Sequence, residues 1–131
     1  MAGGEGMPET GGTVSVEARI VAALRPFGDP VEKSRLYAAA NKRPRRYYTF
    51  VVQSLGDAYG DDEPGCERWL VQVHLFAPLA ENCIRRTDRT KKALFWAGFT
   101  WPSMVDATDQ DGQHYVFECE TAAGVPELEA E

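Results

Sequence analysis

The first hydrophobic pattern in the chain is that of an amphipathic helix. Within residues 13–27, apolar side chains recur at Val16, Ile20, Val21, Leu24 and Phe27. Spacings of three and four residues place these side chains on one face of a helix. Gly28 and Pro30 follow and predict its end, because proline cannot continue a helix and glycine readily adopts the conformation that closes one.

Two later segments alternate between apolar and other side chains, as β-strands do. Residues 46–54, RYYTFVVQS, predict a strand with Tyr48 and Phe50 in or against the core. Residues 68–78, RWLVQVHLFAP, carry the strongest strand pattern of the chain. Together they predict a hairpin whose acidic connection, residues 55–67, is longer than the usual loop of about two to five residues.

Residues 83–97, CIRRTDRTKKALFWA, predict a second helix. We expect it to bury Ile84, Leu94 and Ala97 and to expose a cationic face. Gly98 follows in the position that commonly closes a helix.

The remaining segments complete a two-layer α+β fold. A short strand or irregular segment follows Pro30, another short strand is expected within FTWPSMVDATD, and HYVFECET predicts the last strand. The element order is then α-β-β-β-α-β-β, with two helices on one face of a mostly antiparallel or mixed sheet of four to five strands. Residues 13–123 form this single domain, and we expect residues 1–12 and the acidic tail 124–131 to be disordered.

The composition is that of an ordinary globular domain with an acidic balance. The 131 residues carry 14 basic and 20 acidic side chains, for a net charge of −6. Any basic function must therefore be local, since nucleic-acid-binding domains are usually basic overall. The three cysteines, Cys66, Cys83 and Cys119, have neither disulfide-framework nor zinc-ligand spacing and predict reduced thiols. We expect an intracellular protein without membrane partners, because no signal peptide and no bilayer-length apolar run is present.

Candidate catalytic chemistry is sparse. His74 and His114 lie in predicted strands, where they could share a face with Glu118, but no metal-binding spacing accompanies them. A pairing of Cys119 with His74 depends on a sheet order that the sequence does not give. The segment GDAYGDDEPG lacks both the lysine of a phosphate-binding loop and the alternation of a calcium loop. We therefore predict no enzyme, no catalytic or metal site, and no cofactor.

Basic residues gather in two segments, and acidic residues in a third. Residues 32–46 carry six basic side chains and one acidic one, and residues 85–92 carry five and one. Three interpretations stay open: a solvated surface, a surface that meets copies or partners of opposite charge, and a surface that faces DNA. Under the second interpretation, the candidate contact residues are Arg43, Arg45, Arg46, Tyr47, Arg85, Arg86 and Arg89, with Asp61, Asp62 and Glu63 of the acidic segment.

A third motif, FWAGFTWP, concentrates aromatic residues at the end of the second helix. Phe95, Trp96, Phe99 and Trp101 lie within seven residues. A helix end and the segment after it cannot turn all four side chains inward, so at least one tryptophan should be exposed. Exposed tryptophans are enriched at interfaces, which makes Trp96 and Trp101 candidate contact residues.

These motifs together resemble the tail-terminator, or tail-completion, proteins of long-tailed bacteriophages and prophages. The resemblance rests on WLVQVHLFAP, on KKALFWAGFTWPS at the end of a basic helix, on QHYVFECE, and upstream on ARIVAALRPFGDPV and RYYTFVVQS. It extends over about residues 16–121 and includes no catalytic signature. The long glycine-rich N-terminus and the basic KRPRR turn depart from the family pattern.

The resemblance implies a structural virion protein at the head-proximal end of the tail, assembled in the host cytoplasm. Such a protein forms a ring, in the family a hexamer, that caps the tail tube, ends its polymerisation and offers a surface to the head-side connector, while genomic DNA passes through the lumen. The arginines of KRPRR would then face a neighbouring subunit or the channel, and residues 55–67 would contact the tube or a neighbour. Two alternatives remain, a head-closure or connector adaptor and a DNA-binding module.

Overall fold

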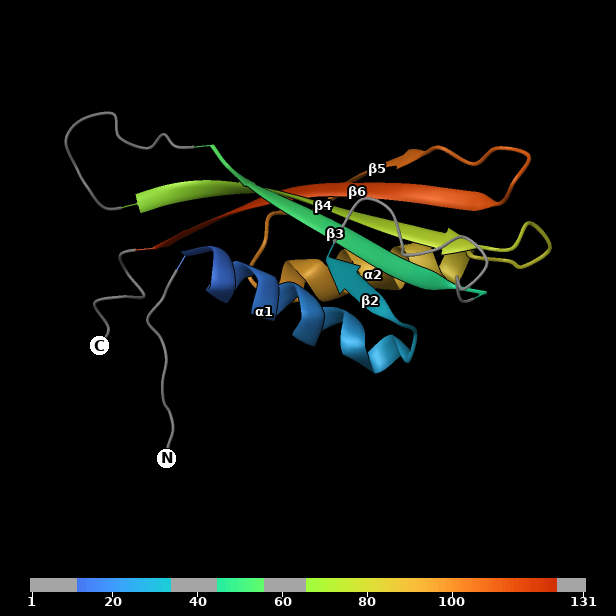
Figure 1. The fold of residues 1–131 in the computed structure, drawn as a ribbon, viewed down its shortest axis with the longest axis horizontal. Helices are drawn as coiled ribbons and strands as arrows, with labels where there is room; N and C mark the ends of the chain where they lie inside the picture. The colour runs from blue at the N-terminus through green and yellow to red at the C-terminus, as the bar shows by residue number, and fades with distance from the viewer. Residues whose placement is uncertain (1–11, 34–44, 56–65, 125–131) are drawn as a thin grey trace.

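The computed structural model describes residues 12–33, 45–55 and 66–124. In chain order the elements are α1 (Gly12–Leu24), the 3-10 helix η1 (Arg25–Phe27), β2 (Val31–Lys33), β3 (Tyr47–Ser54), β4 (Cys66–Ala77), α2 (Ile84–Trp96), β5 (Ser103–Asp106) and β6 (Gln113–Gly124). The sheet lies in one layer and the two α-helices lie together beneath it (Figure 1). The predicted α+β class and element order are confirmed.

The sheet has five strands in the order β2-β3-β4-β6-β5. The long strands β3, β4 and β6 are antiparallel neighbours, with Phe50 opposite Val73 and Val73 opposite Phe117. At the edges, β2 pairs in parallel with β3, and β5 pairs antiparallel with β6. The predicted hairpin is the β3–β4 pair.

The core lies between the helices and one face of the sheet. Because side chains alternate along a strand, one set from each long strand points to the helices. The fully buried core side chains include Val16, Ile20, Leu24, Tyr48, Val71, Val73, Leu75, Leu94 and Phe117. The stripe predicted for residues 13–27 therefore faces inward, and Gly28 closes the following 3-10 helix with φ +83°.

Helix α2 corrects one prediction about the core. Ile84 is 75% exposed rather than buried, and the face that packs inward carries Thr87, Thr90 and Leu94. The Thr90 hydroxyl can be buried because it bonds the Tyr48 hydroxyl at 2.8 Å and donates to the Arg86 carbonyl at 2.8 Å. The buried face of α2 thus includes polar side chains, which is possible because their hydroxyls are hydrogen-bonded.

The domain extends slightly beyond the predicted limits, since α1 begins at Gly12 and β6 ends at Gly124. The predicted disorder of residues 1–11 and 125–131 lies outside the described residues. In the part of the chain that is described, neither helix has the length and apolar character of a bilayer span.

Candidate interaction surfaces

Three arginines predicted to face a partner are held by acids of the same chain. Arg46 donates from Nε to Asp29 Oδ2 at 3.0 Å and from Nη1 to Glu81 Oε1 at 2.8 Å. Arg86 donates from Nη1 to the same Asp29 oxygen at 2.5 Å. Arg45 reaches Glu81 Oε2 at 2.9 Å. This network joins the turn after η1, the start of β3, the turn after β4, and α2.

Burial and hydrogen bonding with Asp29 together set the ionisation of Arg46 and Arg86. The side chains of Asp29 and Arg86 are 13% and 17% exposed, and the Arg86 guanidinium lies 4.9 Å from the centre of the Phe27 ring. The hydrogen bond with Asp29 raises the pKa of Arg46. Burial pulls the pKa of Arg86 down, but the hydrogen bonds with Asp29 and Tyr48 outweigh it and raise that pKa. These arginines therefore remain charged.

Three of the predicted contact residues have contacts inside the chain, and their role toward a partner stays a prediction. Arg46 and Arg86 turn to Asp29, and Tyr47 is only 5% exposed. Arg46 and Arg86 therefore have partners inside the chain, whereas the Tyr47 ring lies in a surface described below. Arg45 keeps 69% of its side chain exposed and stays a candidate. Arg43, together with the acidic candidates Asp61, Asp62 and Glu63, lies outside the described residues.

The α2 outer face is a candidate surface that includes several predicted contact residues. We define it as the side chains that project away from the sheet: Ile84, Arg85, Asp88, Arg89, Lys92, Phe95 and Trp96, all exposed. Its apolar ends stand in solvent, with Ile84 75% and Trp96 78% exposed. Between them lie three basic side chains and one acid, of which Lys92 pairs with Asp88 at 3.1 Å. This face is cationic and apolar together.

The predicted exposure of a tryptophan is confirmed for both candidates. Trp101 is 51% exposed, and its ring meets Phe95 edge-on with the ring centres 5.6 Å apart. Phe99 is instead buried at 3% exposure. Trp96, Trp101 and Phe95 thus form an apolar area at the end of the α2 outer face, a composition typical of contact surfaces.

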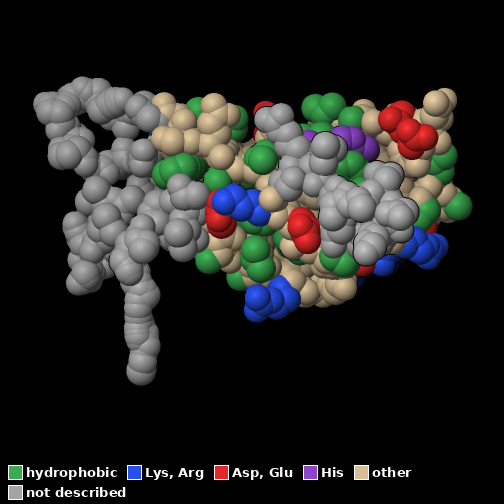
Figure 2. All heavy atoms as spheres, viewed as in Figure 1, with side chains coloured by type: hydrophobic (Ala, Val, Ile, Leu, Met, Phe, Trp, Pro, Cys, Tyr) green, Lys and Arg blue, Asp and Glu red, His purple; other side chains and the backbone are tan. Residues whose placement is uncertain are grey.

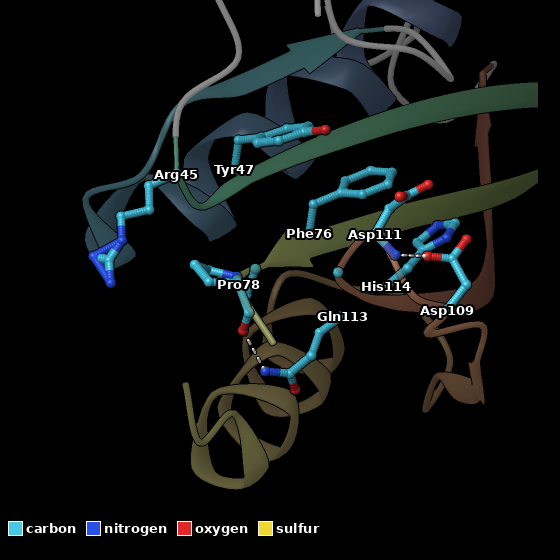
Figure 3. Close-up of a pocket in the computed structure, with 10 residues that line it drawn as sticks. Arg45, Tyr47, Phe76, Pro78, Asp109, Asp111, Gln113 and His114 are labelled. Atoms are coloured by element: carbon cyan, nitrogen blue, oxygen red, sulfur yellow. Dashed lines mark hydrogen bonds between the residues drawn. The ribbon is translucent and has the colours of Figure 1, made fainter. Parts of the chain in front are cut away.

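A second surface lies on the sheet face away from the helices. Tyr47, Phe76 and His114 are opposite one another on β3, β4 and β6, and their rings stack with centres 4.7 Å and 4.3 Å apart. Together with Asp109 and Asp111 they line a groove of about 300 Å³ (Figure 3). We call it the aromatic groove.

The far wall of the aromatic groove is the tight turn between β5 and β6. Asp111 donates its backbone N–H to Asp109 Oδ1 at 2.8 Å, and Asp109 pairs with Gly112 through both backbone groups. Gly112 is needed there because a Cβ atom would lie 3.1 Å from the Ala77 carbonyl oxygen. The turn therefore places both aspartates beside the ring column, and the hydrogen bond holds the Asp109 carboxylate.

His74 and His114 are brought together by the β4–β6 register. His74 Nδ1 lies 2.8 Å from His114 Nε2, so one imidazole donates and the other accepts. Burial lowers the pKa of His114, although Asp109 and Asp106 act in the opposite direction. The two histidines therefore lie on the same face of the sheet, whereas Cys119 points to the helix side.

The charges of the two surfaces have opposite signs. The α2 outer face is net positive, whereas the described acids on the sheet side include Asp109, Asp111, Glu118 and Glu120, of which Glu120 pairs with Arg68. Figure 2 shows an acidic group over the turn between β5 and β6, away from the basic side chains of the helix layer. The molecule is therefore polarised across its two layers.

Sequence reasoning missed two of these features. The exposure of Ile84 has no local signal, and the aromatic groove depends on strand register. The alternation of residues 68–78 is a signal that puts His74 and Phe76 on one face of a strand, but it does not give the register with the neighbouring strands. Among the described residues, no group of three or more metal-ligating side chains comes together.

Comparison with known proteins adds no family to this picture. No protein-family model matches the chain, and no curated protein matches its sequence. The features that bear on function are therefore the α2 outer face, the aromatic groove and the resemblance of the sequence motifs.

Proposed function

We propose that this chain is a structural subunit that assembles into a ring and caps the tail tube of a long-tailed bacteriophage. The observation that carries the proposal is the α2 outer face. At one end of this face Phe95, Trp96 and Trp101 are 46%, 78% and 51% exposed, and Phe95 contacts Trp101, so the exposed apolar area is contiguous, as at interaction sites. Covering these side chains against another protein surface removes apolar area from water and favours association.

The charge distribution supports a ring rather than a symmetric dimer. A twofold contact joins a surface to itself, whereas a ring joins two different surfaces of the same chain. The α2 outer face is cationic, so apposing two copies of it would bring Arg85 and Arg89 against like charges. The acidic sheet side is the complementary surface.

The resemblance to tail-terminator proteins supplies the biological setting. It supports a hexameric ring in the virion, at the head-proximal end of the tail, with the tube protein below and the head-side connector above. DNA would pass through the lumen without sequence-specific contacts. A head-closure or connector adaptor would use the same kinds of surface, and binding to the tube separates the two roles.

Binding of DNA by the α2 outer face is a second candidate function, favoured by Arg85, Arg89 and Lys92 along one helix. Phosphate contacts release counterions, so binding to duplex DNA should weaken steeply with salt. Fluorescence anisotropy with a labelled duplex between 50 and about 300 mM salt tests this function. A weak, salt-insensitive signal excludes it.

The capping function is tested with the tube protein of the same virus. We expect the full chain, added during tube polymerisation, to shorten the tubes and to leave ring density at one end in electron micrographs. The test variant is Trp96→Ala, which removes the most exposed apolar side chain of the α2 outer face and should therefore shorten the tubes less than the original chain does. Unchanged tube lengths, together with no co-sedimentation of the chain with tubes, would refute the proposal.

A further inference from the structure

The aromatic groove has the chemistry of a receptor for a long basic side chain. Its walls are the ring column of Tyr47, Phe76 and His114, and its rim carries the exposed carboxylates of Asp109 and Asp111. Figure 3 shows both aspartates beside the His114 ring. An arginine or lysine can lay its aliphatic stem along apolar surface while its charged end meets a carboxylate.

The carboxylates of Asp109 and Asp111 have no ion pair among the described residues and can therefore bind a cation. Asp109 Oδ1 accepts only the backbone N–H of Asp111 among the hydrogen bonds of the described residues, and neither carboxylate is in an ion pair there. Arg45 also lines the groove, but it lies toward the opposite end and pairs with Glu81 at 2.9 Å (Figure 3). The acidic rim is therefore unneutralised from within the described chain.

The complementary group is present on the other layer of the same molecule. Arg85 and Arg89 are exposed and four residues apart on α2, which puts them side by side on the α2 outer face. Neither arginine has an ion pair among the described residues, where the acid of that face, Asp88, pairs with Lys92. Two guanidinium groups side by side can meet two carboxylates held in one turn.

We propose that Arg85 and Arg89 of one copy dock onto Asp109 and Asp111 at the aromatic groove of the next copy. This inference rests on the proposed ring and names the contact that builds it. The two surfaces lie on opposite layers of the molecule, so the contact is head-to-tail and repeats from copy to copy. Ile84 and Trp96 flank the arginines and are covered in the same contact.

A second copy fits the groove better than a nucleic acid or a free small molecule. The carboxylates of the groove repel phosphate, and the ligand that they attract is a cation. The chain carries such cations on a rigid helix, at the spacing of one helical turn, with apolar side chains at both ends. The occupant is therefore the α2 outer face of another copy.

Charge exchange between the two surfaces tests the inference in the full-length chain. The variants are Arg85→Glu with Arg89→Glu, Asp109→Arg with Asp111→Arg, and the combination of all four. The matched control is Arg25→Glu, compared with Arg89→Glu alone, because both single variants change the net charge equally and Arg25 is exposed away from both surfaces. Oligomer mass against concentration is measured by native mass spectrometry and sedimentation velocity at about 150 mM salt, after circular dichroism shows each variant folded.

We expect each two-residue reversal to raise the concentration needed for assembly at least about tenfold, because it replaces two attractions with repulsions. The four-residue exchange should restore assembly to within about tenfold of the original chain, and the control should assemble normally. Assembly that is unaffected by both reversals, or that is not restored by the exchange, overturns this contact while leaving the ring proposal standing. A wild-type chain that never associates, alone or with tube, overturns both.

Discussion

Asp29 offers the sharpest test of the inference that Arg46 and Arg86 stabilise the fold through their bonds inside the chain. Asp29→Asn keeps the shape of the side chain and one carbonyl oxygen, but removes the charge that both guanidinium groups share. A hydrogen bond to a charged group contributes about 1.5–3 kcal/mol. Arg86 is mostly buried, so its bond with Asp29 should contribute nearly that amount to stability. Arg46 is 34% exposed and keeps its bond with Glu81, so the loss of its bond with Asp29 should cost little. We expect Asp29→Asn to lower the free energy of unfolding by about 2 kcal/mol.

Urea unfolding followed by circular dichroism measures this loss directly. The matched control is Asp88→Asn, which removes the same charge from a pair with Lys92 whose side chains are 51% and 55% exposed. Exposed pairs on a helix contribute less than about 0.5 kcal/mol. The slope of free energy against urea should stay unchanged in both variants, since neither alters the area exposed on unfolding.

The result that would refute the reasoning is a loss for Asp29→Asn as small as that for Asp88→Asn. The shared network would then contribute nothing to the fold, and Arg46 and Arg86 would return to the candidate contact surface. A double-mutant cycle with Arg86→Gln adds an independent check, because residues in direct contact should be non-additive by at least about 0.5 kcal/mol.

Three further predictions concern exposure, pH and thiol reactivity. Trp96→Ala should leave the free energy of unfolding within about 0.5 kcal/mol of the original yet weaken assembly, whereas Leu94→Ala, at a fully buried position, should lose about 3 kcal/mol; equal losses by urea titration would contradict this. Burial lowers the pKa of His114, so the unfolded chain binds the proton more readily than the folded chain. The free energy of unfolding should therefore be highest above about pH 6.5 and should fall as the pH drops through the lowered pKa. His114→Gln should flatten that part of the pH dependence, and an unchanged profile would argue against it. Burial raises the pKa of Cys119 to about 12, so iodoacetamide at about pH 8 should label it only in urea, as peptide mass spectrometry would show; rapid labelling of the folded chain would disagree.

The fold could be predicted from local patterns because most of its elements have them. The three- and four-residue spacing in α1 and the alternation in β3 and β4 each point one set of side chains inward, and those sets are the core. The helix α2 was harder. Its buried positions include Thr87 and Thr90, whose hydroxyls bond backbone carbonyls one turn earlier, so polarity hides the inward face.

The candidate surfaces were predictable only in part. Composition alone indicated a basic helix and an exposed tryptophan. It could not show that Arg86 meets Asp29, 57 residues away in sequence, because that contact follows from how α2 crosses the sheet. The histidine pair and the aromatic groove likewise require the β4–β6 register, which hydrophobic alternation does not fix by itself.

The central claim is that this chain works by assembling through two unlike surfaces. Sedimentation velocity of the full-length chain, from low micromolar to millimolar concentration, at low and at high salt, tests it most directly. The account predicts a single closed species of several subunits that grows in population with concentration and weakens with salt, as a contact between charged surfaces should. A species that stays at monomer mass at every concentration, with tail tube present as well as without it, would contradict it.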